Sequence, residues 1–139
     1  MTLRSNVALA VVVGPQGVLL IERQDGVPPV AFPGGKVESG KTVEQAAVRE
    51  TDEETCYRVR PVCVLGRRLH PTTGAHITYV AAEVVTRPVA VSPAPEAGGE
   101  EVVAYWRPVP EALRLLGPTL FEPVRRYLEV LPKGRPGTP

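Results

Sequence analysis

The sequence contains little cysteine and no long apolar run. Its two cysteines, Cys56 and Cys63, are too few for a disulfide framework, and their spacing is not the C-x-x-C of a zinc or redox site. No apolar stretch approaches the roughly 20 residues that a membrane span needs. The apolar run at residues 7–13 is short and lacks the cleavage site of a signal peptide. These absences predict reduced thiols, a cytoplasmic location and no membrane partner.

An excess of charge of one sign is also absent. Sixteen basic residues stand against fifteen acidic ones, which leaves a formal net charge of +1. A protein that binds a nucleic acid polymer usually carries a clear basic excess. We therefore expect no nucleic acid partner, and any function must depend on local groups of charge.

The length and composition predict one globular domain. A chain of 139 residues is close to the size of a single domain. Its 43% hydrophobic and 22% charged residues are typical of soluble proteins and exclude disorder of the whole chain. We expect the domain to span residues 1–131 and residues 132–139 to form a flexible tail, because the tail holds no core-forming residue. A monomer and a homodimer both remain open.

The hydrophobic pattern predicts the order strands, helix, strands, helix. The expected strands are residues 7–13, 18–21, 57–69, 76–85 and 102–106, and the expected last helix is 118–131. The first two strands and the next two should form antiparallel pairs. Residues 24–35 and 87–101 are rich in helix breakers and are expected to be loops. This order indicates an α+β structure with helices that cover a mixed or antiparallel sheet.

A central helix is predicted from Thr42 to Thr55. Thr42 and Gln45 match a capping box, Glu44 suits the positive end of the helix dipole, and the stretch contains neither proline nor glycine. With 3.6 residues per turn, three small apolar residues and three acids fall on one face. They are Val43, Ala46, Ala47, Glu50, Glu53 and Glu54.

The acids of this face predict a cation site. Three carboxylates that continue an apolar stripe repel one another and lose hydration, and a divalent cation among them is the simplest resolution. Mg²⁺ is typically held by a few carboxylates together with water and substrate phosphate oxygens. Gly34 and Gly35 precede the helix and would let backbone groups approach a metal or a phosphate. Arg49 can pair with Glu53 at i,i+4. The alternative is an acidic face in solvent.

These residues resemble a known family. Gly35, Arg49-Glu50 and Glu53-Glu54 stand at the spacing of the Nudix box, G-x5-E-x7-R-E-U-x-E-E-x-G-U, in which U is a bulky apolar residue. The preceding Pro-Gly-Gly and the chain length are also similar to small Nudix domains of the MutT type. The resemblance implies a Nudix-type α/β/α sandwich, in which helices cover a mixed sheet.

The resemblance also implies the roles of individual residues. Glu50, Glu53, Glu54 and the carbonyl of Gly34 would ligate Mg²⁺ or Mn²⁺, and Arg49 would assist the catalytic acids. Glu50 could alternatively take a proton from the attacking water. Family members often recruit a further acid from the loop before the last strand, where this chain has Glu100 and Glu101, and Glu101 is our choice.

Candidate substrate contacts follow from the same resemblance. Arg23 resembles a phosphate-contacting arginine of MutT-like enzymes, and Gly35 would approach the phosphates. Phe32 and Tyr79 could border a base pocket, and each could equally be a core residue. For the basic residues near the 71–74 turn, contacts to phosphate or sugar oxygens and a solvated strand end remain alternatives. These are Arg67, Arg68 and His70.

Four positions depart from the box. Lys41 replaces its first glutamate, Thr51 and Cys56 replace an apolar residue and a glycine, and Tyr57 occupies the last apolar position. Lys41 reverses a charge beside the expected metal site, and Glu38 is the alternative acid there. If the helix ends in a left-handed residue, Cys56 costs roughly 1–2 kcal/mol relative to glycine.

The resulting functional prediction is Mg²⁺-dependent hydrolysis of a pyrophosphate bond in a nucleoside triphosphate or another nucleoside diphosphate linked to a second group. The short chain favours a MutT-like enzyme over an ADP-ribose or nucleotide-sugar pyrophosphatase. Lys41 keeps a second hypothesis open, a Nudix domain that binds a nucleotide without catalysis. In both cases the partner is a small-molecule nucleotide. A globular domain with an acidic helix and no ligand is the third alternative.

Overall fold

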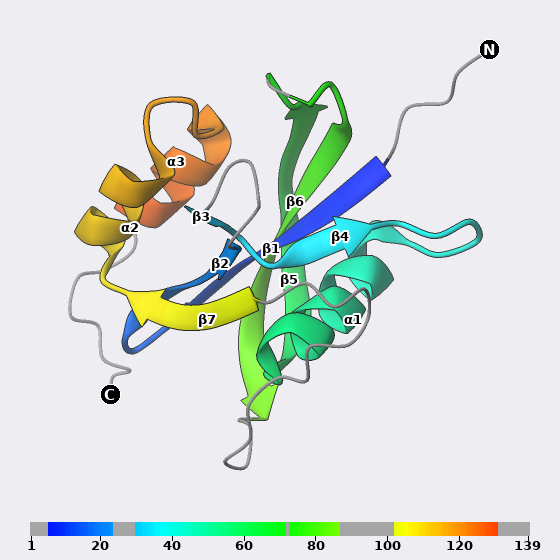
Figure 1. The fold of residues 1–139 in the computed structure, drawn as a ribbon, viewed down its shortest axis with the longest axis horizontal. Coiled ribbons are helices and arrows are strands. Elements are labelled where there is room, and N and C mark those ends of the chain that lie inside the picture. The colour runs from blue at the N-terminus through cyan, green and yellow to red at the C-terminus, as the bar shows by residue number, and fades with distance from the viewer. Residues whose placement is uncertain (1–5, 24–29, 72, 87–101, 131–139) are drawn as a thin grey trace.

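The computed structural model describes residues 6–23, 30–71, 73–86 and 102–130 of the chain. These residues form seven strands and three helices (Figure 1). They are β1 (Asn6–Gly14), β2 (Gly17–Arg23), β3 (Val30–Ala31), β4 (Gly34–Lys36), α1 (Val43–Thr55), β5 (Arg58–Leu69), β6 (His76–Thr86), β7 (Val102–Arg107), α2 (Val109–Leu116) and α3 (Glu122–Glu129). The expected loop at 87–101 and the expected tail at 132–139 lie outside the described residues.

The strands form one mixed sheet in the order β3-β2-β1-β6-β5, with β4 paired to β1 and β7 paired to β2. β1 and β6 run parallel, and every other pair is antiparallel. Both predicted antiparallel pairs, β1 with β2 and β5 with β6, are therefore confirmed. Figure 1 shows α1 on one side of the sheet and α2 with α3 on the other, which confirms a mixed sheet covered by helices.

Alternation along β1 supplies both layers of the core. Successive side chains of a strand point to opposite faces. Ala8, Ala10 and Val12 accordingly pack in the cluster that contains α1, whereas Leu9 and Val11 pack in the cluster that contains α2 and α3. Because both faces of β1 are covered, its sequence reads as a continuous apolar run rather than as an alternating one.

Helix α1 has the predicted start and end. The Thr42 hydroxyl accepts a hydrogen bond from the Gln45 amide at 3.0 Å, and the Gln45 side chain accepts one from the Thr42 amide at 2.9 Å. Cys56 follows the last turn with φ 65°, in the left-handed region. The helix therefore ends with the backbone conformation that favours glycine, although a cysteine stands there.

Two parts of the prediction were wrong. The segment before α1 was expected to be a loop throughout, but it contains the short strands β3 and β4. Near the C-terminus, α3 is shorter than the expected helix at 118–131, and α2 was not expected at all. Pro110 lies in the first turn of α2 and Pro123 in that of α3. Proline is tolerated there because those amides have no partner within the helix. No helix among the described residues is long and apolar enough to cross a membrane.

Candidate functional site

The glycine pair of β4 lies directly against two acids of α1. The Gly34 amide donates a hydrogen bond to Glu54 Oε1 at 3.0 Å. A Cβ at Gly35 would lie 2.5 Å from the carboxyl carbon of Glu50, and a Cβ at Gly34 would collide with the Ala8 carbonyl oxygen. Any side chain at 35 would therefore displace the Glu50 carboxylate. Gly35 is therefore required by the Glu50 carboxylate, and Gly34 by the close approach of the β1 backbone at Ala8 and Leu9.

The three acids of the box differ in exposure. The side chains of Glu50 and Glu54 are 19% and 16% exposed, whereas that of Glu53 is 57% exposed. The buried side of α1 continues through Thr51 and Thr55, which are 0% and 3% exposed. At 100° per residue, Glu53 lies about 80° from Val43, on the side away from Thr51. Glu50 and Glu54 thus face the protein as predicted, but Glu53 lies at the rim.

Arg49 connects the acids on this side of the helix. Its Nη2 lies 2.7 Å from Glu50 Oε2, its Nη1 lies 3.1 Å from Glu38 Oε1, and its Nε lies 3.8 Å from Glu53 Oε2. The hydrogen bond to Glu50 raises the pKa of Arg49 above its ordinary value, against the opposing effect of burial. The predicted pair with Glu53 is present, and the pair with Glu50 is the shorter one.

Two residues near this cluster had weak signals in the sequence. Glu38, considered there only as a substitute for the missing box glutamate, is a direct partner of Arg49. Lys41 is exposed, and its amide donates to the Glu38 carbonyl at 3.0 Å. It forms no ion pair with any residue that the structure describes. The lysine therefore leaves the contacts of Glu50 and Glu54 intact.

The predicted substrate residues fall into different places. Arg23 Nη2 lies 4.0 Å from Glu54 Oε2, so this arginine belongs to the cluster. Phe32 and Tyr79 are both 2% exposed and meet edge to face at 6.3 Å between ring centres, so neither offers a free face for base stacking in this structure. Arg67 is exposed on β5, with β1 and β6 between it and β4. Glu101 lies outside the described residues.

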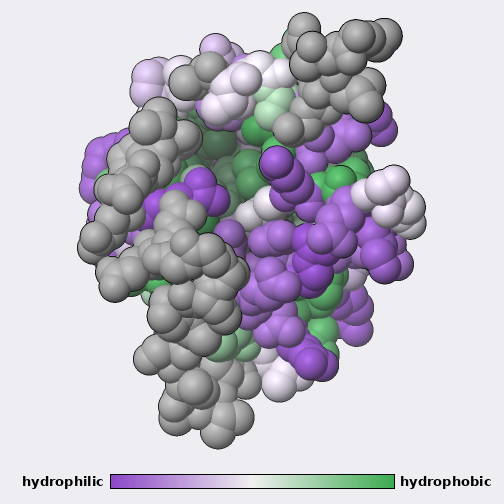
Figure 2. All heavy atoms as spheres, turned by 45° about the vertical axis from the view of Figure 1, so that its right-hand side comes forward, coloured by the Kyte–Doolittle hydropathy of each residue, from purple (hydrophilic) through white to green (hydrophobic). Residues whose placement is uncertain are grey.

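The oxygen donors of this cluster suit a hard cation. Among the described residues, no three acidic, histidine or cysteine side chains gather closely enough to hold a metal ion unaided. Mg²⁺ does not require such a cage, because it is commonly bound by one or two carboxylates, with water and phosphate oxygens as the remaining ligands. Glu50 and Glu54, partly buried beside the two glycines of β4, fit this kind of site. Figure 2 shows that hydrophilic residues form a broad area of the molecular surface beside an apolar hollow.

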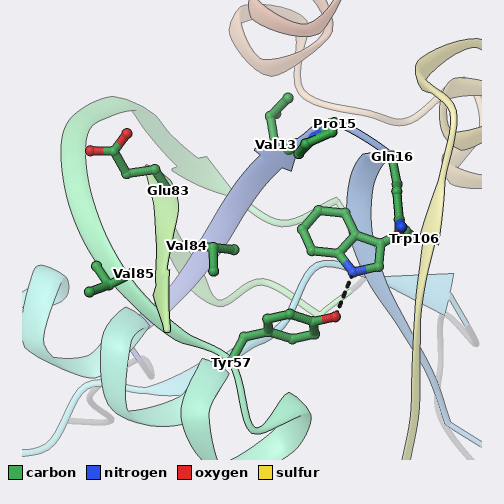
Figure 3. A pocket seen from close by; sticks show the side chains of 9 residues that line it. Val13, Pro15, Gln16, Tyr57, Glu83, Val84, Val85 and Trp106 are labelled. Carbon is green, nitrogen blue, oxygen red and sulfur yellow. Dashed lines mark hydrogen bonds between the residues drawn. The ribbon is translucent and has the colours of Figure 1, made fainter. Parts of the chain in front are cut away.

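A cavity of about 330 Å³ lies elsewhere, just beyond the C-terminal end of α1 (Figure 3). The β1–β2 turn, Tyr57, the 83–85 segment and Trp106 line it. The Trp106 indole N–H donates to the Tyr57 hydroxyl at 2.9 Å, and the rings meet edge to face at 5.4 Å. None of the α1 acids lines this cavity. Tyr57, which departs from the box pattern, thus has a packing role here.

Comparisons with known proteins agree on one family and one fold. The chain matches the model of the family described as "NUDIX domain" over residues 2–128. A Bacillus subtilis (strain 168) protein named "Putative 8-oxo-dGTP diphosphatase" is 52% identical over 42 residues, which are 30% of this chain and 28% of that protein. The match to this relative thus spans little more than a quarter of its length.

Solved structures resemble the chain over most of its length. A NUDIX hydrolase from Nitrosomonas europaea superposes with a TM-score of 0.69 at 20% identity, and the match covers 94% of this chain and 97% of that one. A MutT protein from Methanosarcina mazei Go1 gives 0.60 at 21% identity, with 91% of each chain covered. An ADP-ribose pyrophosphatase from Streptococcus suis 89-1591 gives 0.62 at 17% identity, with 78% and 76% covered. At these identities the likeness establishes the fold.

Proposed function

The chain belongs to the NUDIX domain family, and from this premise we propose that it hydrolyses a pyrophosphate bond in a nucleoside triphosphate or another nucleoside diphosphate derivative. The contact that carries the proposal is the one between β4 and α1, where the Gly34 amide binds the Glu54 carboxylate and the absence of a side chain at Gly35 leaves space for that of Glu50. We propose Mg²⁺ as the metal, with Mn²⁺ as the alternative.

The metal ligands in this proposal are Glu50, Glu54 and the carbonyl of Gly34, with Glu53 from the rim. Bound there, the cation would neutralise phosphate charge and position a water for attack. Arg49 holds Glu50 Oε2 at 2.7 Å, and this favours Glu50 as a ligand over Glu50 as a general base. We keep Glu101 as a further proposed ligand on sequence grounds alone.

We propose that Arg23 contacts a substrate phosphate. Its Nη2 lies 4.0 Å from Glu54 Oε2. The Arg23 side chain as a whole is 28% exposed, so part of it remains accessible to a ligand. An arginine beside a metal-bound phosphate adds charge-assisted hydrogen bonds. Gly35 contributes by leaving the backbone bare beside Glu50. Phosphates would thus meet a cation on one side and a guanidinium on the other.

A nucleoside triphosphate is our preferred substrate class. The Bacillus subtilis relative is named for a nucleoside triphosphate, and it is 52% identical over the 42 residues that it matches. The Streptococcus suis neighbour is named for ADP-ribose at 17% identity, which gives weaker support for that alternative.

The experiment is a hydrolysis panel of nucleoside triphosphates, ADP-ribose and nucleotide sugars, with and without Mg²⁺. Glu54→Gln removes one charge from the proposed site, and Glu44→Gln removes one from the first turn of the same helix, at the end away from Glu54. We expect Glu54→Gln to lower kcat/KM by about 100-fold or more, because a metal ligand supplies several kcal/mol. Glu44→Gln should retain activity. Equal turnover by wild type and Glu54→Gln would refute the metal site.

Lys41 motivates the second candidate, a domain that binds nucleotides without hydrolysing them. Nucleotide binding by calorimetry without turnover of any panel member would favour it. The Lys41→Glu variant then measures what the lysine does: a large gain in turnover would mean that Lys41 disables the site. Mg²⁺-dependent hydrolysis by the wild-type protein would exclude this candidate.

A further inference from the structure

Arg68 has no acidic partner in the part of the chain that the structure describes, and its surroundings are those of a binding residue. It is half-buried on β5. Its Nε and Nη2 donate to the Tyr79 hydroxyl at 3.3 and 3.1 Å. No carboxylate lies within ion-pair distance of it among the residues that the structure describes. Arginine has five N–H donors, so three of them have no acceptor in these contacts.

Aromatic rings hold this guanidinium in place. Its central carbon lies 5.2 Å from the centre of the Phe121 ring and 5.8 Å from that of Tyr79. The rings of Tyr79 and Phe121 stack on each other at 5.1 Å, and the Phe32 ring meets that of Tyr79 edge to face at 6.3 Å. Gly66 permits this packing, because a Cβ there would lie 2.9 Å from the Phe121 ring. The side chain is thus fixed without being neutralised.

The strand register relates Arg68 to the candidate active site. Gly34 of β4 is aligned through β1 and β6 with Gly66 of β5. Two residues further along these strands, Lys36 of β4 is aligned in the same way with Arg68 of β5. Three strand spacings separate the two aligned residues in each case, or about 14 Å. One nucleotide can span that distance. A substrate that reaches from the β4 edge to Arg68 would lie along the side of the sheet that faces α2 and α3, where Ile77, the register partner of Arg68, also packs.

On these grounds we propose that Arg68 is a specificity-determining residue, which recognises the base of the substrate by its hydrogen-bond acceptors. This inference rests on the proposed function. The spare donors of a guanidinium match the adjacent O6 and N7 acceptors of a 6-oxopurine, in the bidentate pairing that arginine forms with guanine. Adenine carries an amino group at position 6 instead of an oxygen. Its N–H donors would face the N–H donors of the arginine, with no acceptor between them. The proposal therefore assigns the site a 6-oxopurine nucleotide.

The test compares GTP, ITP and ATP as substrates. GTP and ITP share the 6-oxo group and N7, whereas ATP lacks the oxo group. The variants are Arg68→Gln and Arg68→Lys, and Arg60→Gln is the matched control on the same strand, where the side chain is exposed and paired with Glu83. Lysine keeps the charge but not the planar pair of donors.

We expect the wild-type protein to prefer GTP and ITP over ATP by about 5- to 150-fold in kcat/KM, the range for a bidentate base contact. Arg68→Gln and Arg68→Lys should both bring this preference close to one, while Arg60→Gln should leave it unchanged. An equal loss for all three substrates would overturn the proposal in favour of a structural role. Retained activity in Arg68→Lys with loss in Arg68→Gln would overturn it in favour of a phosphate contact.

A binding measurement separates this inference from the proposed function. Calorimetry with GMP, IMP and AMP needs no turnover. If no triphosphate is hydrolysed but GMP and IMP bind more tightly than AMP in an Arg68-dependent manner, the proposed function fails and the recognition by Arg68 stands. If hydrolysis proceeds and neither the kinetic nor the binding preference depends on Arg68, only the present inference fails.

Discussion

Replacement of Thr51 by valine should stabilise the protein. Thr51 is fully buried on α1, and its hydroxyl has no hydrogen-bond partner among the described residues. A buried polar group without a partner costs about 1–3 kcal/mol. Valine has nearly the same shape and no hydroxyl, so it removes that cost and leaves the packing in place. We expect a gain of about 1–2 kcal/mol in the free energy of unfolding.

Thr55 provides the matched control, one turn further along the same buried side of α1. Its hydroxyl donates to the Thr51 carbonyl at 2.6 Å and accepts from the Tyr57 amide at 3.1 Å. Thr55→Val makes the same chemical change but breaks two hydrogen bonds and leaves the Tyr57 amide without this acceptor. We expect a loss of about 1–3 kcal/mol. The same substitution at two positions of one helix should therefore change the free energy of unfolding in opposite directions.

Urea unfolding is the assay, followed by the fluorescence of the single tryptophan, Trp106. The expected difference between the two variants, about 2–5 kcal/mol, exceeds the 10–15% uncertainty of linear extrapolation for a domain of ordinary stability. The slope of the transition should be the same for all three proteins. A destabilised Thr51→Val variant, or two variants that shift in the same direction by the same amount, would refute the reasoning.

Two further perturbations test the helix end and the turn after β5. Cys56→Gly should relieve the roughly 1–2 kcal/mol of strain that φ 65° imposes on an L-residue. The greater backbone freedom of glycine in the unfolded chain offsets part of this gain, so the free energy of unfolding should rise by about 0.5–1 kcal/mol. Cys56→Ala keeps the strain, and an equal gain for it in urea unfolding would contradict this explanation. Burial and the charge of Arg68 lower the pKa of His70 in the folded protein. In the unfolded chain this pKa has its ordinary value of about 6.5, so as the pH falls the unfolded chain binds the proton before the folded protein does. Stability should therefore fall as the pH drops below about 6.5, and His70→Gln should reduce that fall; parallel stability profiles of the two proteins would exclude the effect.

The local signals in the sequence were sufficient to predict the helix that carries the acids. A capping box and an interior without proline or glycine define α1, and the structure begins and ends it at the expected residues. The short range of these signals explains this success, because each acts within one or two turns. The acid spacing also predicted correctly that Glu50 and Glu54 face the protein.

Features that depend on distant parts of the chain were harder to predict. The pattern alone put Glu53 on the same side as Glu50, but the sheet covers the side of α1 that continues through Thr51. The prolines near the C-terminus were interpreted as loop signals and instead occupy the first turns of α2 and α3. That Arg68 has no ion-pair partner among the described residues could not be foreseen, because it depends on the side chains of Tyr79 in β6 and of Phe121 at the start of α3.

The parallel pairing of β1 with β6 has a consequence for how the protein folds during synthesis. In the chain, the two strands are separated by β2, β3, β4, α1 and β5. At 5–20 residues per second, a ribosome completes β6 several seconds after β1. Throughout that interval the edge of β1 that β6 later occupies lacks its partner, and an unpaired apolar edge promotes aggregation. A nascent chain that already contains Gly34 and Glu54 is thus still vulnerable, and chaperone protection of this interval should govern the yield of active protein.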